Sequence, residues 1–236
     1  MIVYFKEDIP MTFTQSLTNL GVVILLSASS LAATSFNTFA ADNFNTQLLN
    51  LQQHWVQVNY QLVDEAQEKG FENLVKQAQS LVAANPDNAN GLIWLGIIES
   101  SYAGAKGGIG ALSLAKKAKK ALEESMKIDD SALNGSAYTS LGTLYHKVPG
   151  WPLGFGDDGT AKEMLEKAML INPNGIDSNY FYGEFLFDEK EYTKAKKHLM
   201  LALQAPARQE RPLADEFRRV EINQLMVKVD KKINRN

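Results

Sequence analysis

The chain has 236 residues and contains no cysteine. Cysteine thiolates bind structural zinc and iron–sulfur clusters, form disulfides and act as nucleophiles, so all of these features are excluded. A cysteine-linked lipid anchor is excluded for the same reason, and no lipoprotein is expected.

Histidine is scarce as well, with His54, His146 and His198 far apart in the sequence. No HExxH pattern, nucleophile elbow (GxSxG) or phosphate loop (GxxxxGK[ST]) is present. The glycine-rich segment 104–110 is therefore interpreted as a flexible bend between helices. We expect a protein that is not an enzyme and that carries no metal and no cofactor.

Long apolar runs are also missing, apart from residues 20–32 near the N-terminus, which are too short and too serine-rich for a membrane span. Small residues at Thr38 and Ala40 suit cleavage before Ala41, which predicts a signal peptide over 1–40 and a mature chain of 41–236. The acidic first residues suggest that Met11 is the true start. The alternative to a cleaved signal peptide is that this segment is retained as an N-terminal anchor. Export would place the protein in the periplasm.

Strand-like alternation of apolar and polar residues is absent after Phe44, where helical periodicity dominates. The pattern predicts a long helix over 43–68, a break at Gly70 and a return helix over 71–84 that ends at Pro86. Further helix pairs are expected around the remaining terminators, and a last helix is expected over about 212–231. The predicted ranges of these pairs are 92–103 with 113–127, 137–145 with 160–170, and 178–187 with 192–203.

The helix ends recur at a spacing that fits a 34-residue period with two insertions, which is typical of helix-turn-helix solenoids. Gly96, Gly142 and Gly183 occupy matching positions, and alanines stand where the partner helix would approach. Glycine inside a helix costs about 1 kcal/mol relative to alanine, so its repetition indicates close packing. The predicted fold is all-α: an α-solenoid of about four degenerate hairpins with a C-terminal capping helix.

Two segments resemble the tetratricopeptide repeat (TPR) superfamily, whose signature is an aromatic residue, Leu-Gly, Tyr, then Ala, an aromatic or Leu, Ala and Pro. One consists of Tyr182, Gly183, Ala195, Leu199 and Ala202, and the other, interrupted by an insertion, of Leu141, Gly142, Tyr145, Ala161, Leu165, Ala168 and Pro173. The resemblance covers roughly residues 70–207, with two degenerate repeats at its start. It implies a protein-interaction module.

A narrower resemblance rests on residues 148–157 (VPGWPLGFGD), 174–177 (NGID) and 180–183 (YFYG). These are similar to exported bacterial TPR-like proteins, including the T-component of tripartite ATP-independent periplasmic (TRAP) transporters. That resemblance implies a pore or groove for a small apolar or anionic ligand, and assembly beside a solute-binding protein.

The loop 150–159 is the main functional candidate, because prolines and glycines make it rigid while it carries two aromatic rings. Trp151 and Phe155 either line a ligand cleft or dock the loop onto neighbouring helices, and Asp157 is expected to cap the next helix. For a partner in the groove, the candidate contacts are Tyr102, Tyr138, Tyr145, Asn179 and Tyr182.

Net charge is −3 overall, but residues 194–236 carry an excess of Lys and Arg. This basic tail either attracts an acidic partner or simply solvates the last helices. The lysines at 116–120 lack interleaved aromatic residues, so nucleic acid is not an expected partner.

The function that fits best is a non-catalytic periplasmic adaptor that binds a protein or peptide. The alternative is a T-component-like accessory protein that binds a small ligand. Either form allows a homo-oligomer.

Overall fold

The structure is a computed structural model that describes residues 35–235, except for the side chains of residues 35–42 and of Ile109. The predicted signal segment falls largely outside the described residues, and the expected cleavage point after Ala40 lies within the first helix. The described chain is helical without strands. Its helices are α1 (Ser35–Gln61), α2 (Asp64–Ala84), α3 (Ala89–Lys106), α4 (Gly108–Ile128), α5 (Ala132–Lys147), α6 (Asp158–Ile171), α7 (Ile176–Asp188), α8 (Tyr192–Gln204) and α9 (Pro212–Ile233).

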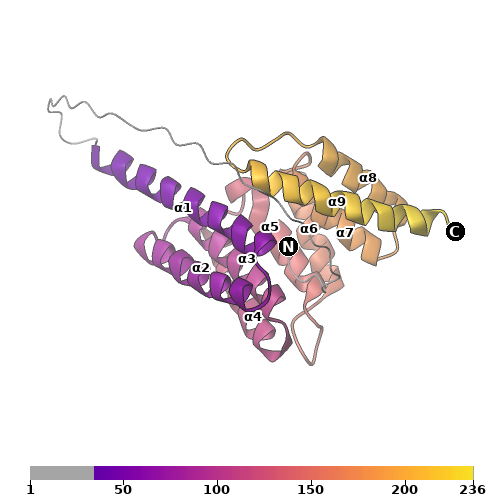
Figure 1. The fold of residues 1–236 in the computed structure, drawn as a ribbon, viewed down its shortest axis with the longest axis horizontal. Coiled ribbons are helices and arrows are strands. Elements are labelled where there is room, and N and C mark those ends of the chain that lie inside the picture. Colours follow the sequence, from indigo (N-terminus) through magenta and orange to yellow (C-terminus); the bar gives the residue numbers. More distant parts are fainter. Residues whose placement is uncertain (1–34, 236) are drawn as a thin grey trace.

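Successive helices pack as hairpins, α1 with α2, α3 with α4, α5 with α6 and α7 with α8, and α9 covers α7 and α8. Figure 1 shows the hairpins following one another along the molecule, with α1 and α9 on the same side. The first helix of each hairpin contacts the first helix of the next, α1 with α3, α3 with α5 and α5 with α7. The predicted all-α, TPR-like solenoid with four hairpins and a capping helix is confirmed.

Close contact within the hairpins depends on the three glycines that the sequence singles out. A Cβ atom on Gly142 would lie 2.6 Å from the Leu165 side chain and 3.0 Å from the carbonyl oxygen of Ala161. Gly96 meets Leu122 and Ala118 in the same way, and Gly183 meets Leu199 and Ala195. The predicted opposition of Gly96, Gly142 and Gly183 to Ala118, Ala161 and Ala195 is thus confirmed.

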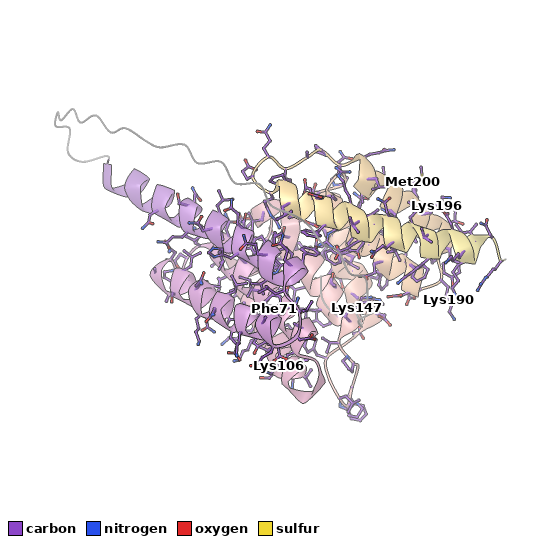
Figure 2. All side chains as sticks on the ribbon, in the orientation of Figure 1. Phe71, Lys106, Lys147, Lys190, Lys196 and Met200 are labelled. Atoms are coloured by element: carbon purple, nitrogen blue, oxygen red, sulfur yellow. The ribbon has the colours of Figure 1, made fainter. Side chains whose placement is uncertain are left out.

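The hydrophobic core extends through all hairpins as stacked layers of buried side chains. Phe71, Leu74 and Trp55 are buried between the first three helices, and Phe71 lies in the interior (Figure 2). Leu122, Leu144, Leu165 and Leu199 continue the core along the array, each with 1% exposure or less. A solenoid is stabilised in this way by contacts between neighbouring repeats.

The first hairpin differs from the prediction. The helix expected over 43–68 ends at Gln61, and Gly70, the expected breaker, lies inside α2. There its missing side chain lets α1 approach, because a Cβ atom would lie 2.9 Å from both methyl groups of Val58. The turn consists of Leu62 and Val63, and Asp64 starts α2 with a positive φ of 52°.

The glycine-rich bend is also shorter than predicted. Gly107 alone separates α3 from α4, with a φ of 62° that favours glycine. Gly104 and Gly110 lie inside the two helices, so the segment is a tight corner and not a long flexible bend.

A strained turn opens α5. Leu133, Asn134 and Gly135 all adopt left-handed backbone conformations, with φ of 48°, 55° and 72°. A non-glycine residue in that region costs about 1–2 kcal/mol, so two in succession are unusual. The turn brings Gly135 against Ile171, where a Cβ atom would lie 3.0 Å from the Ile171 side chain.

None of the helices in the described chain has the length and apolar character that crossing a membrane would require.

Candidate binding site on the inner face

The tyrosines proposed as partner contacts tie the helices together. The hydroxyl groups of Tyr102, Tyr138 and Tyr182 donate to Glu72, Asp130 and Glu166 at 3.0, 3.0 and 3.2 Å. In each case the acceptor belongs to the helix before the tyrosine, or to the turn that leads into the tyrosine's own helix. Tyr102 and Tyr138 are buried. These contacts stabilise the stacking of hairpins, and a role of these tyrosines in binding stays a prediction.

Asn179 was placed in the groove by the sequence interpretation, and its burial corrects that placement. The side chain is fully buried, and its amide nitrogen donates to the carbonyl oxygens of Pro173 and Gly175 at 2.7 and 3.0 Å. Its amide oxygen lies 3.0 Å from Nδ1 of His198. Asn179 therefore fixes the turn before α7 and offers no surface to a partner.

The loop 150–159 separates its two aromatic residues. Trp151 is 91% exposed at the tip, whereas the Phe155 ring packs edge-on against Tyr145, with 5.5 Å between centroids. The Phe155 ring thus docks the loop, and the two rings do not enclose a common space. Asp157 caps α6 as predicted, because its carboxylate accepts from the backbone N–H of Thr160 at 2.6 Å.

The candidate site lies instead on the inner face, which is formed by the first helices of the four hairpins. There a small, partly open space of about 60 Å³, the central cavity, is lined by residues of α1, α3, α5, α7, the α8–α9 connection and α9. Its lining combines apolar and aromatic side chains with hydroxyl and charged groups. The lining residues are Trp55, Trp94, Ile97, Ser100, Ser136, Thr139, Ser140, Thr143, Asp177, Phe181, Arg211 and Arg218.

None of the eight residues that the sequence proposed as binding contacts is among those lining the central cavity. Asp177 carries the one usable sequence signal, because it ends the NGID segment of the narrower resemblance. Arg211 and Arg218 come from the basic tail, residues 194–236. The sequence shows the charge excess of this tail, but it does not show which residues the arginines contact.

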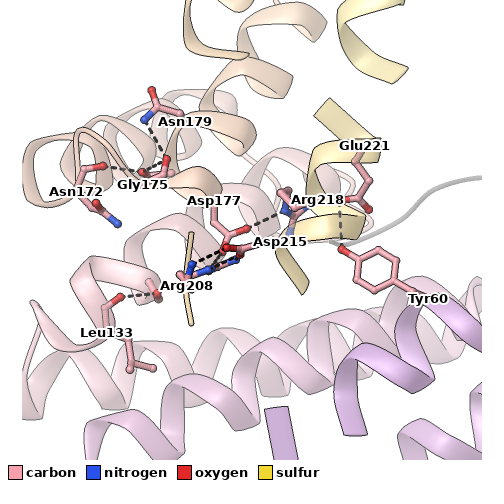
Figure 3. A network of polar contacts seen from close by, with 12 residues as sticks. Tyr60, Leu133, Asn172, Gly175, Asp177, Asn179, Arg208, Asp215, Arg218 and Glu221 are labelled. Carbon is pink, nitrogen blue, oxygen red and sulfur yellow. Dashed lines mark hydrogen bonds and ion pairs between the residues drawn. The ribbon is translucent and has the colours of Figure 1, made fainter. Parts of the chain in front are cut away.

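A network of ion pairs forms one wall of the central cavity (Figure 3). Asp177 accepts from Arg208 at 2.6 Å and from Arg218 at 2.8 Å, so both of its carboxylate oxygens are occupied. Arg208 also binds Asp215, and Arg218 binds Glu221. The network joins the start of α7 to α9.

Local structure explains why Asp177 stands at this point. It lies in the first turn of α7, where the helix dipole favours a negative charge. Burial alone would raise the pKa of Asp177, but Arg208 and Arg218 hold it well below its usual range. Asp177 is therefore ionised throughout the physiological pH range, and it orders two arginines.

Arg218 is buried within the network, with 4% exposure. Its guanidinium stacks on the rings of Tyr180 and Phe181, with 4.5 and 4.6 Å to the centroids. Burial alone would lower the pKa of Arg218, but the ion pair with Glu221 and the charge of Asp177 outweigh it and raise that pKa. Arg218 is thus a positively charged side chain that is held in a fixed position between α7 and α9.

Arg211 differs from the other two arginines. Its guanidinium lies over the Trp94 ring at 4.8 Å, and it forms no ion pair with any residue in the described part of the chain. Its Nε atom is buried without a hydrogen-bond partner, as is Oγ of Ser100, another residue of the lining. Burial and the nearby Arg208 lower the pKa of Arg211 to about 10.

Chemically, the central cavity presents hydrogen-bond donors beside aromatic surface. Within residues 43–235, no group of three or more His, Asp or Glu side chains is placed to hold a metal ion. The three histidines lie outside the lining of the cavity. Ligand binding and the absence of catalysis both stay predictions.

Comparison with known proteins adds little to this geometry. No protein-family model matches the chain, and no curated protein does. Among solved structures, one described as "Functional Characterization of Pseudomonas Aeruginosa pilF" is similar, with 15% sequence identity, 83% of this chain and 93% of that chain covered, and a TM-score of 0.34. At that TM-score the fold assignment rests on the helices and contacts described above.

Proposed function

We propose that the chain is a non-catalytic adaptor of the periplasm, whose repeats bind a partner protein or peptide at the central cavity. The observation that carries this proposal is the pair of unsatisfied polar groups, Arg211 Nε and Ser100 Oγ, on the inner face. Buried polar groups are nearly always hydrogen-bonded. Four such groups in the described residues lack a partner, and two of them belong to residues that line this one small space, which favours an external partner. The signal-like segment before Ala41 supports the location.

The size of the central cavity limits what it holds. Sites for drug-sized ligands enclose about 300–1,000 Å³. A space of about 60 Å³ accepts a group of only a few atoms. This favours the end or side chain of a larger partner over a complete metabolite.

The proposal is tested by site-specific photocrosslinking in the periplasm of the native host. The crosslinking residue replaces Ser140, which lines the central cavity, and, in a matched control, Ser113, which is exposed on α4. We expect a protein adduct at position 140 that is absent at 113, and the adduct protein, once purified, should bind the wild-type chain. Equal adducts at both positions, or none, would refute the adaptor function.

A second candidate is the small-ligand accessory protein of the T-component kind, which would act beside a solute-binding protein. The polar groups of the central cavity favour it too, but the cavity volume restricts its ligand to a very small molecule. Native mass spectrometry of protein purified from its host tests this function. A bound small molecule, together with no adduct at position 140, would favour it over the adaptor.

A further inference from the structure

Three large apolar side chains form an exposed line along the outer face of α9, which we call the α9 row. Leu213, Val220 and Val227 are 36%, 39% and 53% exposed. They are seven residues apart, which is close to two helical turns, so they lie along one side of the helix. Ile222 and Val229, which are fully buried, lie on the opposite side.

Such a row is unexpected on a helix that caps a solenoid. Terminal capping repeats need a polar outer face to stay soluble, because no further repeat packs on them. Within the described chain α9 contacts α1, α7 and α8, and it lies at the surface of the molecule (Figure 1). Single exposed apolar residues are normal on a protein surface, whereas a continuous row at heptad spacing is typical of a helix that packs against another helix.

The row is symmetric about its middle residue. Leu213 stands seven residues before Val220, and Val227 stands seven residues after it. If two copies of α9 lie antiparallel, Val220 of each copy meets Val220 of the other, and Leu213 of each meets Val227 of the other. One surface then pairs with itself under a two-fold rotation, which is the commonest symmetry of homo-oligomers. A second copy therefore explains this symmetry, which a different partner would not require.

The charges of α9 favour the antiparallel over the parallel arrangement. Glu210 and Glu216 lie at the N-terminal end of the helix, and Lys228, Lys231 and Lys232 lie at its C-terminal end, all of them exposed. An antiparallel pair brings the acidic end of each helix beside the basic end of the other. A parallel pair would place like charges together, which is unfavourable.

The α9 row lies away from the central cavity. Arg218, which lines that cavity, belongs to the buried side of α9. A second copy that packs on the row thus lies on the other side of α9 from the central cavity.

From these observations we infer that two copies of the chain pair through α9 in an antiparallel dimer, with Val220 at the two-fold axis and Leu213 of each copy against Val227 of the other. The dimer goes beyond the proposed function and does not rest on it, because an adaptor acts with one copy or with two. The helix has 22 residues and a length of about 33 Å, so the paired helices alone bury less area than an obligate interface does. The dimer should therefore dissociate on dilution, with a Kd that is roughly micromolar.

Sedimentation equilibrium of the protein and its variants, each purified from the native host, tests the dimer over a wide range of concentrations. We expect a reversible equilibrium between monomer and dimer. Val220→Glu brings two carboxylates together at the axis and should weaken the dimer about tenfold or more, and Val220→Lys should do the same with two ammonium groups. An equal mixture of the two variants should restore the dimer, because opposite charges then meet at the axis.

Leu170→Glu is the matched control, since it introduces the same charge at an apolar residue that is 83% exposed on α6, outside the row. It should leave the dimer unchanged. Rescue by mixing excludes misfolding as the cause of the loss, because two misfolded variants would not dimerise. A monomer at every concentration would overturn the inference. So would a dimer that Val220→Glu leaves intact, or one that the mixture does not restore.

Single cysteines determine the orientation of the two helices, because the chain has no cysteine of its own. Under oxidation with diamide, Val220→Cys should form a disulfide-linked dimer by itself. Leu213→Cys and Val227→Cys should crosslink when the two variants are mixed, and each alone should crosslink far less. Efficient crosslinking of Leu213→Cys to itself would indicate a parallel pair and overturn the antiparallel arrangement. A monomer in which a maleimide labels Val227→Cys only slowly would mean that another segment or partner covers the row, which likewise overturns the inference.

Discussion

Tyr60 at the end of α1 and Phe217 near the start of α9 stack face to face, with 4.4 Å between ring centroids and 5° between planes. The two rings join helices that are separated by most of the described chain. The Tyr60 hydroxyl also donates to Glu221 at 3.3 Å, which connects α1 to the arginine network. Through this contact the first and last helices are joined directly.

The stack is expected to contribute to global stability. Phe217→Ala should lower the free energy of unfolding by about 2 kcal/mol, because it removes a half-buried ring. Tyr60→Phe keeps the stack and should cost only about 1 kcal/mol, through the lost hydrogen bond to Glu221. The coupling between the two rings is measured by urea unfolding and is expected near 1 kcal/mol. The proteins compared are Phe217→Ala, Tyr60→Ala and the double variant that combines these two changes, with Tyr60→Phe measured beside them. Strict additivity would mean that the rings do not act together.

The glycines at the hairpin contacts should differ in their tolerance of alanine. Gly142→Ala would place a methyl group 2.6 Å from the Leu165 side chain and 3.0 Å from the Ala161 carbonyl oxygen. Overpacking of this kind costs about 1–3 kcal/mol and outweighs the gain in helix propensity of about 1 kcal/mol.

Gly183→Ala provides the comparison, since its nearest neighbours lie at 3.1 Å and both belong to the flexible Leu199 side chain. Its stability should stay within about 1 kcal/mol of wild type, as the two effects nearly cancel. Chemical denaturation of both variants measures the difference. Equal losses would show that the contact distance does not control the result.

The hairpin fold was predictable because its determinants are local and periodic. Gly142 and Ala161 lie one helix apart, and their small side chains reveal the contact without knowledge of the rest of the chain. The break between α1 and α2 was not predictable in this way. Leu62 and Val63 carry no glycine or proline signal, and Gly70 serves the packing against Val58 instead.

The candidate site depends on contacts between distant segments, so its geometry was beyond sequence analysis. Tyr60 and Glu221 are 161 residues apart, and Arg218 reaches Asp177 over 41 residues. The exposed aromatic loop, by contrast, was the more conspicuous local pattern. A single sequence shows which residues have binding chemistry, but not which of them face one another.

The two aromatic residues of the loop 150–159 should respond differently to truncation. Trp151 is 91% exposed, so Trp151→Ala should change the free energy of unfolding by less than about 0.5 kcal/mol. Phe155→Ala removes the ring that packs against Tyr145 and should cost about 1–2 kcal/mol. Thermal unfolding of the two variants distinguishes them. A large loss for Trp151→Ala would mean that its ring is docked in solution.

Glu99 should make the stability depend on pH. The side chain is 3% exposed, and burial raises its pKa to about 7, although Lys117 lowers it in part. Because the folded pKa exceeds the unfolded one, the protonated group stabilises the fold below about pH 4.5, and this contribution is lost as the pH rises through about 7. Glu99→Gln should therefore stabilise the protein at pH 8, by about 1–3 kcal/mol.

The control for Glu99 is Glu163→Gln, on the exposed face of α6. It should leave the pH dependence unchanged. Denaturant titrations at pH 5 and pH 8 give the comparison, and a Glu99→Gln variant with the same pH dependence as wild type would contradict the assignment.

His146 should add a second dependence at higher pH. Its Nδ1 lies 2.8 Å from Asp158 and its Nε2 lies 2.9 Å from Asp188, so the protonated ring links α5 to α6 and α7. Burial lowers the pKa of His146, but the hydrogen bonds to Asp188 and Asp158 outweigh it and raise the pKa above its ordinary value. The stabilisation is then complete below the unfolded pKa of about 6.5 and is lost as the pH rises through the folded value.

His146→Gln should abolish this loss between pH 6 and pH 9, whereas His54→Gln, at an exposed position of α1, should not. Melting temperatures across that range test the assignment, and they are measured in the Glu99→Gln background, which removes the effect of Glu99. If the Glu99→Gln variant with His146 intact were equally stable at pH 6 and pH 9, the His146 ring would not be held as a cation between the two carboxylates.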